Sequence, residues 1–417
     1  MHFVCEKHIV VVGAVRTPIG ARDGILKAYS ATDLGAAAIR EALARSGVRG
    51  DQVDEVVLGN VVGAGLGMAL AKKASVGAGI PQNVPATVVN SVCSSGMTAA
   101  WTAVQSITLG TSEVVVAGGM ESRTNAPYLL GPHLSGGKRL KGQLQGKDFQ
   151  LNTTGAGGGP LSGAELDAML RDAGLRDANI VDGLSCPFEA GFVQNDYAIA
   201  YAKKHGYSIQ KIDECAYESY RKAEEAWETG KFDDEVVSVG EARRDELTAR
   251  SRWENLRGKS TSASSGYNTA GLGDAAAALV LTTGERAKKL GLRPLARVKG
   301  LSRYECGPAE FIEAPVHAAK ELVTALRKAG RPTDFPIIEA NESFGLQLIL
   351  FQEAWPKSAI NVHGGTVALR HPLGAAGARI LVTLIHAMRR YGHERGLGTI
   401  CFGGGGAFAT ALELVKD

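Results

Sequence analysis

The chain is predicted to be an α/β protein built around a doubly wound sheet. Apolar strand patterns alternate with amphipathic helix patterns from a first strand at 9–12 to a last strand at 407–414. Strand–helix–strand alternation is typical of a largely parallel sheet covered by helices on both faces. With 417 residues, 45% of them hydrophobic and 21% charged, the chain is long enough for two packed domains of ordinary globular composition.

The first part of the chain supplies alternating elements in order. Asp33 is the expected N-cap of a helix that runs through Arg45 and ends at Gly47. The other expected elements are strands at 9–12, 55–62, 86–92 and 113–117, and helices at about 67–79 and 95–109.

Residues from about 123 to 260 interrupt this alternation. They contain a long polar helix, Ile209–Trp227, and a glycine cluster at 157–159 that Pro160 follows. No Lys-Ser/Thr pair follows the cluster, so a surface loop is favoured over a phosphate loop. This region is predicted to be a lid inserted into the core.

The core pattern then resumes toward the C-terminus. The expected elements are strands at 275–281, 295–301, 336–340, 360–362, 399–402 and 407–414, and helices at 285–290, 315–329 and 375–390. GlyGlyMetGluSer at 118–122 and GlyGlyGlyGlyAla at 403–407 each follow a helix and a strand, which indicates two similar halves. The predicted domains are 1–122 with 261–290, the inserted lid 123–260, and 291–417.

Composition excludes several classes of function. The net charge of +3 has no dominating Lys/Arg run, so no nucleic-acid partner is expected. No run of eighteen apolar residues predicts a membrane span, and the N-terminus lacks a signal-peptide pattern, so a cytoplasmic protein is expected. Six cysteines without a CxxC pair predict reduced thiols and no metal site.

Cys93 is the most informative residue. It lies in ValAsnSerValCysSerSerGlyMet, 89–97, between a β-branched run and a long helical pattern. A thiol at the first turn of a helix faces unpaired amide donors and the positive end of the helix dipole, which lower its pKa. This position predicts a nucleophile that forms a covalent thioester.

Three later phrases place polar groups at the ends of predicted strands, where open α/β sheets hold their sites. They are AsnGluSerPheGly at 341–345, the segment 361–379 with HisProLeuGlyAlaAlaGlyAlaArg, and CysPheGlyGlyGlyGly at 401–406. Taken singly, Cys401 is more often a buried apolar residue and His371 a capping or core residue. Together they supply a base, a second thiol and oxyanion donors for Cys93.

In this order the phrases resemble the signature blocks of the thiolase family, the acetyl-CoA acetyltransferases and 3-ketoacyl-CoA thiolases. The resemblance covers nearly the whole chain except 133–185. It implies a five-layered αβαβα thiolase fold of two similar halves with a lid. It also implies a homodimer or homotetramer that uses acyl-CoA and CoA as substrates, with no further cofactor. The implied reaction is reversible Claisen condensation and thiolytic cleavage.

The resemblance assigns roles to five residues. Cys93 would carry the acyl group and His371 would accept its proton. Cys401 would exchange the α-proton of the second acyl-CoA. His371, with a water held by Asn341, would bind the thioester oxygen of the enolising substrate, and the amides of Cys93 and Gly403 would bind the oxyanion at the acyl-enzyme. The implied substrate contacts are Phe344, Ala270, Val193, Gln194 and Met120.

The sequence departs from the family pattern at several positions. His363 and Arg370 replace an Asn and a Gly in the histidine phrase, and Arg370 either acts on His371 or points away. His363 is more often a packing residue than a third catalyst. Tyr267, Met68, Ala270 and the Val193-Gln194 pair alter positions that contact CoA or the acyl group. The acyl chain therefore stays open.

Two alternatives stay open beside a thiolase. One is a thiolase-fold acyltransferase or ketosynthase that uses an acyl carrier, although Cys401 favours the thiolase. The other is a non-catalytic thiolase-like subunit, against which the complete set of Cys93, His371, Cys401 and Asn341 argues.

Overall fold

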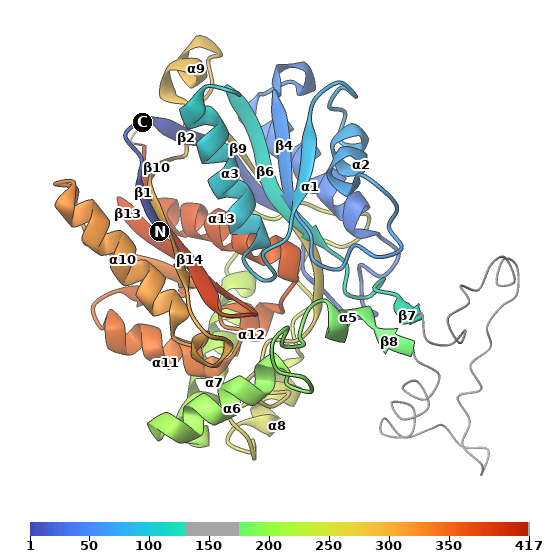
Figure 1. Ribbon diagram of the computed structural model, residues 1–417, viewed down its shortest axis with the longest axis vertical. Helices are drawn as coiled ribbons and strands as arrows, with labels where there is room; N and C mark the ends of the chain where they lie inside the picture. Colours follow the sequence, from blue (N-terminus) through green and yellow to red (C-terminus); the bar gives the residue numbers. More distant parts are fainter. Residues whose placement is uncertain (131–174, 416–417) are drawn as a thin grey trace, which may run out of the picture.

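The computed structural model describes residues 1–130 and 175–415, and Figure 1 shows their arrangement. Two α/β units of similar construction are joined edge to edge by β2 (Ile9–Arg16) and β10 (Ala296–Glu305), which pair antiparallel over two residues. The chain therefore forms one continuous set of strands with a narrow seam between its halves.

The first unit has five main strands with helices on both faces. Its strands lie in the order β2, β9 (Gly273–Thr283), β6 (Val114–Glu121), β4 (Glu55–Gly59) and β5 (Ala86–Val89). β9 is antiparallel to both neighbours, whereas β6, β4 and β5 are parallel. α1 (Ala31–Ser46) and α2 (Leu70–Gly77) pack on the outer face, and α3 (Ser95–Leu109) packs on the inner face.

The second unit repeats this arrangement. Its strands lie in the order β10, β14 (Gly406–Leu414), β13 (Arg395–Phe402), β11 (Ile337–Ala340) and β12 (Ala359–Ile360). β14 is antiparallel to both neighbours and the other pairs are parallel, as in the first unit. Its helices are α10 (Ala314–Lys328), α11 (Gly345–Ala354), the short α12 (Thr366–Leu369) and α13 (Leu373–Tyr391). The predicted duplication is confirmed.

The two glycine phrases that suggested the duplication do not superimpose. Gly118 and Gly119 lie within β6, whereas Gly403 and Gly404 lie in the turn after β13. The prediction was correct because the two halves share a strand order, and the local likeness of the phrases was coincidental.

Three apolar clusters separate five layers. One cluster lies between the outer helices α1 and α2 and the first sheet, and another lies between α10, α11 and the second sheet. The third combines α3 and α13 with side chains of both sheets, and Trp101 of α3 meets Phe408 of β14 edge to face, at 5.7 Å between ring centroids. This is the predicted αβαβα layering, with α3 and α13 as the central layer.

The region predicted as a lid contributes helices beside the strand ends, in the lower part of Figure 1. They are α5 (Ala178–Val181), α6 (Gln194–His205), α7 (Ile209–Glu228) and α8 (Arg250–Leu256). Fully buried Arg16 of β2 ties this region to the core through Glu235 at 2.6 Å and Asp245 at 2.7 Å. The limits 123–260 remain a prediction, and the glycine cluster at 157–159 lies outside the described residues.

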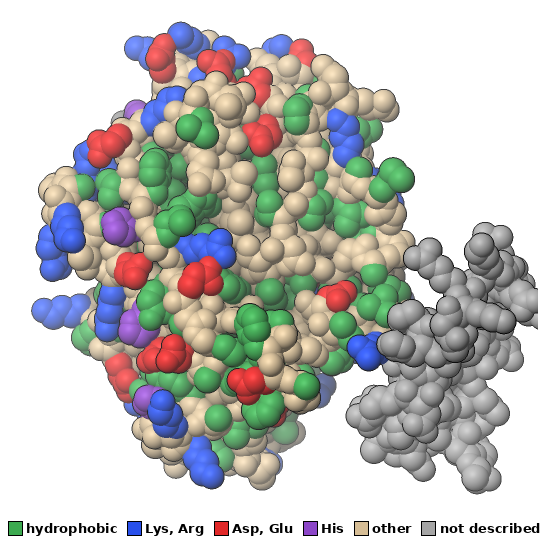
Figure 2. Space-filling view, in the orientation of Figure 1, with side chains coloured by type: hydrophobic (Ala, Val, Ile, Leu, Met, Phe, Trp, Pro, Cys, Tyr) green, Lys and Arg blue, Asp and Glu red, His purple; other side chains and the backbone are tan. Residues whose placement is uncertain are grey.

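Smaller elements complete the fold. They are β1 (His2–Val4), β3 (Gly20–Ala21), β7 (Tyr128–Leu130), β8 (Leu175–Asp177), α9 (Gly284–Lys289) and 3₁₀ turns at 50–52 and 308–310. On the face shown in Figure 2, cationic and anionic side chains are interspersed. Within the described ranges, no helix is both long and apolar enough to cross a bilayer.

Several predicted boundaries were wrong. Ser30 is the N-cap of α1, and Asp33 is the third helical residue, whose carboxylate accepts from the Ser30 amide in a capping box. Predicted strand 55–62 ends at Gly59, whereas predicted strand 113–117 continues to Glu121. The short β12 replaces the strand predicted at 360–362.

Glycines allow α13 to lie directly against α3 and against the first sheet. A Cβ on Gly96 would lie 2.6 Å from the Ala378 nitrogen, and one on Gly377 would lie 2.5 Å from the Met97 nitrogen. A Cβ on Gly119 of β6 would lie 2.0 Å from the Gly374 oxygen. Each of these contacts is to backbone, which cannot rotate away. The N-terminal ends of α3 and α13 therefore meet in the central layer.

Substitution of Gly119 tests this contact. Gly119→Ala is expected to lower the free energy of unfolding by about 1–3 kcal/mol, because the added methyl group must displace the backbone of α13. Urea unfolding measures the change. Gly307→Ala is the control, since φ at Gly307 is −68° and its Cβ would meet nothing within 4 Å. If both variants unfold at the wild-type urea concentration, α13 does not pack this closely on β6.

Candidate active site

Cys93 lies between β5 and α3 in a turn held by its neighbours. β5 ends at Val89 rather than at the predicted residue 92. The Asn90 side-chain oxygen accepts from the Val92 amide at 2.9 Å, and the Ser95 hydroxyl donates to the Val92 carbonyl at 2.6 Å. Val92 has a φ of 49°, a left-handed conformation that is strained for a β-branched residue. This turn places the Cys93 thiol at the start of α3.

Two backbone amides point at the Cys93 sulfur, its own and that of Gly403. Burial raises the pKa of the Cys93 thiol above its usual range, and the neighbouring Cys401 thiol raises it further. The Gly403 amide, the Arg123 guanidinium and the Cys93 amide act in the opposite direction. The amides do lower this pKa, but the net lowering predicted for Cys93 is not found, because desolvation outweighs them. A neighbouring base is therefore needed to form the thiolate.

His371 lies at the matching position before α13. Its amide donates to the Gly271 carbonyl at 2.8 Å, which fixes the backbone beside the loop 268–271. Burial lowers the pKa of the imidazole to about 3, and the charges of Arg123 and Arg379 contribute. In the described part of the chain, neither ring nitrogen has a hydrogen-bond partner. His371 is thus a neutral imidazole with unpaired ring nitrogens, one of which can accept a proton.

Cys401 lies near the end of β13 within a polar cluster. The Ser343 hydroxyl is 3.4 Å from its sulfur, and the Asn341 amide donates to that hydroxyl at 2.7 Å. Thr366 donates to the Asn341 side-chain oxygen at 2.8 Å. Burial raises the pKa of the Cys401 thiol, while hydrogen bonds from Gln347, Ser343 and Asn341 lower it. The second thiol is therefore surrounded by donors that stabilise its anion.

The structure brings the segments of the predicted chemical groups together where the two halves of the molecule meet. The Ser94 hydroxyl, next to Cys93, donates to the Cys401 carbonyl at 3.1 Å, so the two thiol-bearing segments are in contact. The glycine contacts between α3 and α13 bring the segments of Cys93 and His371 together. Sequence reasoning missed Ser343, Gln347 and Thr366, although Ser343 is part of the AsnGluSerPheGly phrase.

The positive charge that acts on His371 comes from Arg123 and Arg379, not from Arg370. Arg370 points away: its Nε donates to the Glu246 carbonyl at 3.1 Å, and its guanidinium lies beside Gly271. Arg123 is fully buried and lies two residues after the end of β6. Sequence reasoning did not single it out, because the predicted strand ended at residue 117, six residues before Arg123.

Four of the five predicted substrate contacts lie in segments beside Ser343 or Gly403. Phe344 is buried and pairs with Thr269, and the Ala270 amide donates to the Ser343 carbonyl at 3.0 Å. Gln194 begins α6 and follows Val193, and its side-chain amide lies 3.1 Å from the position of a Cβ on Gly403.

Met120 is not brought to the site. Its side chain is fully buried on the opposite face of β6, where its sulfur would lie 2.7 Å from a Cβ on Gly35 of α1. Alternation along the strand explains this placement, since Gly119 faces α13 and its neighbour faces α1.

The residues that depart from the family pattern, His363, Tyr267 and Met68, lie in different surroundings. His363 is fully buried and packs edge to face on Phe232, and burial lowers the pKa of its imidazole to about 4. Tyr267 is buried and stacks on Tyr220, whereas Met68 is 91% exposed. His363 is thus a packing residue, as its sequence context favours.

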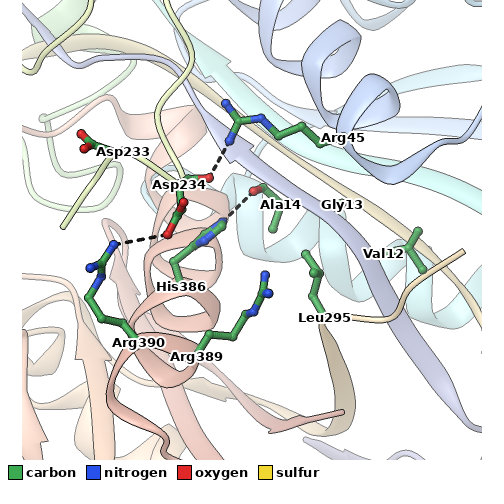
Figure 3. A pocket seen from close by; sticks show the side chains of 10 residues that line it. All are labelled: Val12, Gly13, Ala14, Arg45, Asp233, Asp234, Leu295, His386, Arg389 and Arg390. Atoms are coloured by element: carbon green, nitrogen blue, oxygen red, sulfur yellow. Dashed lines mark hydrogen bonds and ion pairs between the residues drawn. The ribbon is translucent and has the colours of Figure 1, made fainter. Parts of the chain in front are cut away.

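A cavity of about 730 Å³ opens elsewhere, lined in part by β2 and α13 (Figure 3). Arg45 donates to the Asp234 carbonyl, Arg390 donates to the Asp234 carboxylate, and the His386 ring lies 2.9 Å from the Ala14 carbonyl. None of the predicted site residues lines it.

The duplicated fold and the buried site between its halves define an α/β acyltransferase. Residues 9–285 match the model of the thiolase N-terminal domain, and residues 292–414 match that of the thiolase C-terminal domain. The chain belongs to the thiolase family.

Relatives of known name agree. The chain is 37% identical to the acetyl-CoA acetyltransferase of Escherichia coli, over 98% of this chain and 99% of the relative. It is 36% identical to that of Cupriavidus necator, over 97% and 99%. The crystal structure of Acat5 thiolase from Ascaris suum in complex with coenzyme A has a TM-score of 0.81 and 33% identity, over 98% of this chain and all of that one. The protein is thus an enzyme with thiolase function, which resolves the open choice against a ketosynthase or a non-catalytic subunit.

The pKa of His371 predicts a pH dependence of stability. The imidazole titrates near 6.5 when unfolded and near 3 when folded, so between these values the unfolded chain binds the extra proton. The stability conferred by neutral His371 is present above pH 6.5 and is lost as the pH falls toward 3. His371→Asn is expected to reduce the loss of unfolding free energy between pH 6 and 4.5 by about 1.4 kcal/mol per pH unit.

Urea unfolding at several pH values measures this slope. His205→Asn replaces an exposed histidine and is expected to keep the wild-type slope. An unchanged slope in His371→Asn would show that the buried imidazole does not resist protonation.

Proposed function

We propose that the protein catalyses reversible condensation and thiolytic cleavage between acyl-CoA with acetyl-CoA and 3-ketoacyl-CoA with CoA, through an acyl-enzyme on Cys93. The observation that carries this proposal is the convergence of Cys93, the Gly403 amide, a neutral His371 and a second thiol, Cys401. Acetyl-CoA is named for the relatives, and CoA is bound in the Ascaris suum thiolase, which supports these substrates here.

In the first half-reaction, His371 removes the proton of Cys93, and the sulfur attacks the thioester carbonyl. The amides of Cys93 and Gly403 lower the pKa of that thiol and would bind the oxygen as it becomes negative. Collapse of the tetrahedral intermediate expels the CoA thiolate, which takes the proton held by His371. The acyl group exchanges one thioester bond for another, so the step is reversible.

In the second half-reaction, Cys401 as thiolate removes the α-proton of acetyl-CoA, and the resulting carbanion attacks the carbonyl of the acyl-enzyme. The bond between that carbonyl and the Cys93 sulfur breaks, Cys93 leaves as a thiolate, and it recovers the proton that Cys401 gained, so both thiols return to their starting states. Ser343, Gln347 and Asn341 stabilise the Cys401 anion, which supports a thiol in this role. The proposed water held by Asn341 remains a prediction. Asn341 itself is held by Ser343 and Thr366.

Two cysteine substitutions separate these steps. With acetoacetyl-CoA and CoA, the wild type is expected to consume the ketothioester and to show an acetyl adduct on Cys93 by mass spectrometry. Cys93→Ala is expected to abolish both. Cys401→Ser is expected to retain the adduct from acetyl-CoA but to lose about 10²–10⁴-fold of carbon–carbon bond exchange, the usual contribution of a general acid–base.

Cys215→Ser is the control, because this thiol lies on α7 and contacts Gln352 instead of the site. Turnover that survives Cys93→Ala would overturn the acyl-enzyme. Equal loss of acylation and bond exchange in Cys401→Ser would show that Cys401 is not the α-proton catalyst.

A further inference from the structure

Arg123 is a buried cation with unused hydrogen-bonding capacity. Its side chain is fully buried, its Nε donates to the Asn179 side-chain oxygen, and its Nη2 donates to the Asn179 carbonyl at 3.3 Å. Nη1 has no partner in residues 1–130 and 175–415, and no carboxylate of these residues forms a salt bridge with the guanidinium. Arg cannot release its charge by deprotonation, so the site retains a cation whose charge acts on Glu121, Asp177 and Cys93 without a salt bridge to either carboxylate.

The guanidinium lies beside the proposed acyl site. A Cβ on Gly183 would lie 3.3 Å from Arg123 Nη2 and 2.9 Å from the side chain of Leu373, two residues after His371. The next residue, Leu184, accepts a hydrogen bond from the Gln194 amide at 3.1 Å. Arg123 thus lies beside the loop at Gly183 and Leu184, which holds Gln194 in contact with Gly403.

Gln194 provides a second unsatisfied group on the same side. Its side chain lies against Gly403, whose amide faces the Cys93 sulfur, and its buried Oε1 has no partner among the described residues. Buried polar groups in native proteins are almost always hydrogen-bonded, so two orphaned groups beside one reactive thiol indicate a polar ligand. An acyl chain that is purely hydrocarbon would leave Arg123 Nη1 unpaired, whereas Gln194 Oε1 is an acceptor and needs a donor instead of an anion.

The anions of the reaction itself have other partners. The Cys93 and Gly403 amides serve the thioester oxyanion, and the Cys401 anion is served by Ser343, Gln347 and Asn341. The phosphates of CoA are at the far end of the pantetheine arm from the thioester. The Arg123 charge also lowers the pKa of Cys93, but Arg123 Nη1 makes no hydrogen bond among the described residues. That N–H group is therefore available to an anion on the acyl chain.

We propose that Arg123 binds a carboxylate carried by the acyl group, so that the preferred acyl donors are thioesters of dicarboxylic acids. A carboxylate can accept from Nη1 and from the second N–H of Nη2, the paired arrangement that Arg favours. This inference rests on the proposed function and specifies its acyl substrate.

Matched acyl donors test the proposal. Succinyl-CoA and butyryl-CoA have acyl chains of equal carbon number and differ in a terminal carboxylate, and glutaryl-CoA and pentanoyl-CoA form a longer pair. Single-turnover CoA release, with the Cys93 adduct followed by intact mass, gives each acylation rate. In at least one pair, the wild type is expected to favour the carboxylate by about tenfold or more, because a hydrogen bond to a charged group contributes at least that factor.

Variants assign this preference to Arg123. Arg123→Gln is expected to lose the preference and Arg123→Lys to retain part of it. Arg22→Gln is the charge-matched control: Arg22 is 43% exposed, and its Nη2 lies 3.9 Å from the carboxylate of Asp177, two residues before Asn179. It is expected to keep the wild-type ratio. Thermal unfolding identifies any variant that fails to fold. The ratio of acylation rates within each donor pair, measured on the wild type, tests the proposal even if a variant does not fold.

The outcomes separate this inference from the proposed function. No carboxylate preference in either pair by the wild type would overturn the inference. Equal slowing of both members of a pair by Arg123→Gln would also overturn it, since Arg123 would then act on the Cys93 thiolate instead of the acyl chain. Absence of a Cys93 adduct with every donor, acetyl-CoA included, would instead overturn the proposed function.

Discussion

The site depends on the close contact between α3 and α13. Both helices begin at the same place in the central layer, and the residues that meet there are glycines with backbone atoms under them. The contact holds Cys93 at the start of one helix and His371 at the start of the other. Because each helix N-terminus presents unpaired amides and a positive dipole end, the same packing that joins the halves also makes their junction favourable for anions.

Glu121 secures this junction from the first sheet. Its buried carboxylate accepts from the amides of Val61, Val62 and Gly374 and from the Asn60 side chain, at 2.8–3.1 Å. Gly374 lies in the first turn of α13, so a carboxylate at the end of β6 caps the helix that His371 precedes. The first half of the chain thus fixes the position of a functional residue in the second half.

Local patterns predicted the elements of the core and the junctions where reactive residues lie. The helix 95–109 and the strand–helix junction at Cys93 follow from short-range sequence, because apolar periodicity and turn residues determine them. The predicted boundaries were wrong where tertiary contacts determine the length of an element. At β6, for example, the last residues belong to the strand because they pair with β9. The net direction of the Cys93 pKa shift was not predicted for the same reason. Distant segments bury this thiol, and the residues beside it in the sequence do not reveal that burial.

Arg123 and Arg370 show that position in the sequence does not reveal which charged side chain lies near the site. Arg370 adjoins His371 in sequence, yet its positive φ of 75° and its bond to Glu246 are associated with a side chain that points away. Arg123 is distant in sequence, yet its charge acts on both Cys93 and His371. Which cation reaches the imidazole is decided by the packing of β6 against α13, which no local pattern encodes.

The duplication explains why the reactive residues come from matching positions. Cys93 precedes α3 after β5, and His371 precedes α13 after β12, so the thiol and the imidazole occupy equivalent junctions of the two halves. Asn60 and Asn341 follow the equivalent strands β4 and β11, but Asn60 binds the structural carboxylate Glu121, whereas Asn341 binds Ser343 beside Cys401. Each half supplies the same scaffold positions. The two halves have diverged: the end of β6 carries Glu121, which caps α13, whereas the equivalent strand β13 carries the second thiol, Cys401. The site is therefore a product of both halves, and neither half contains it alone.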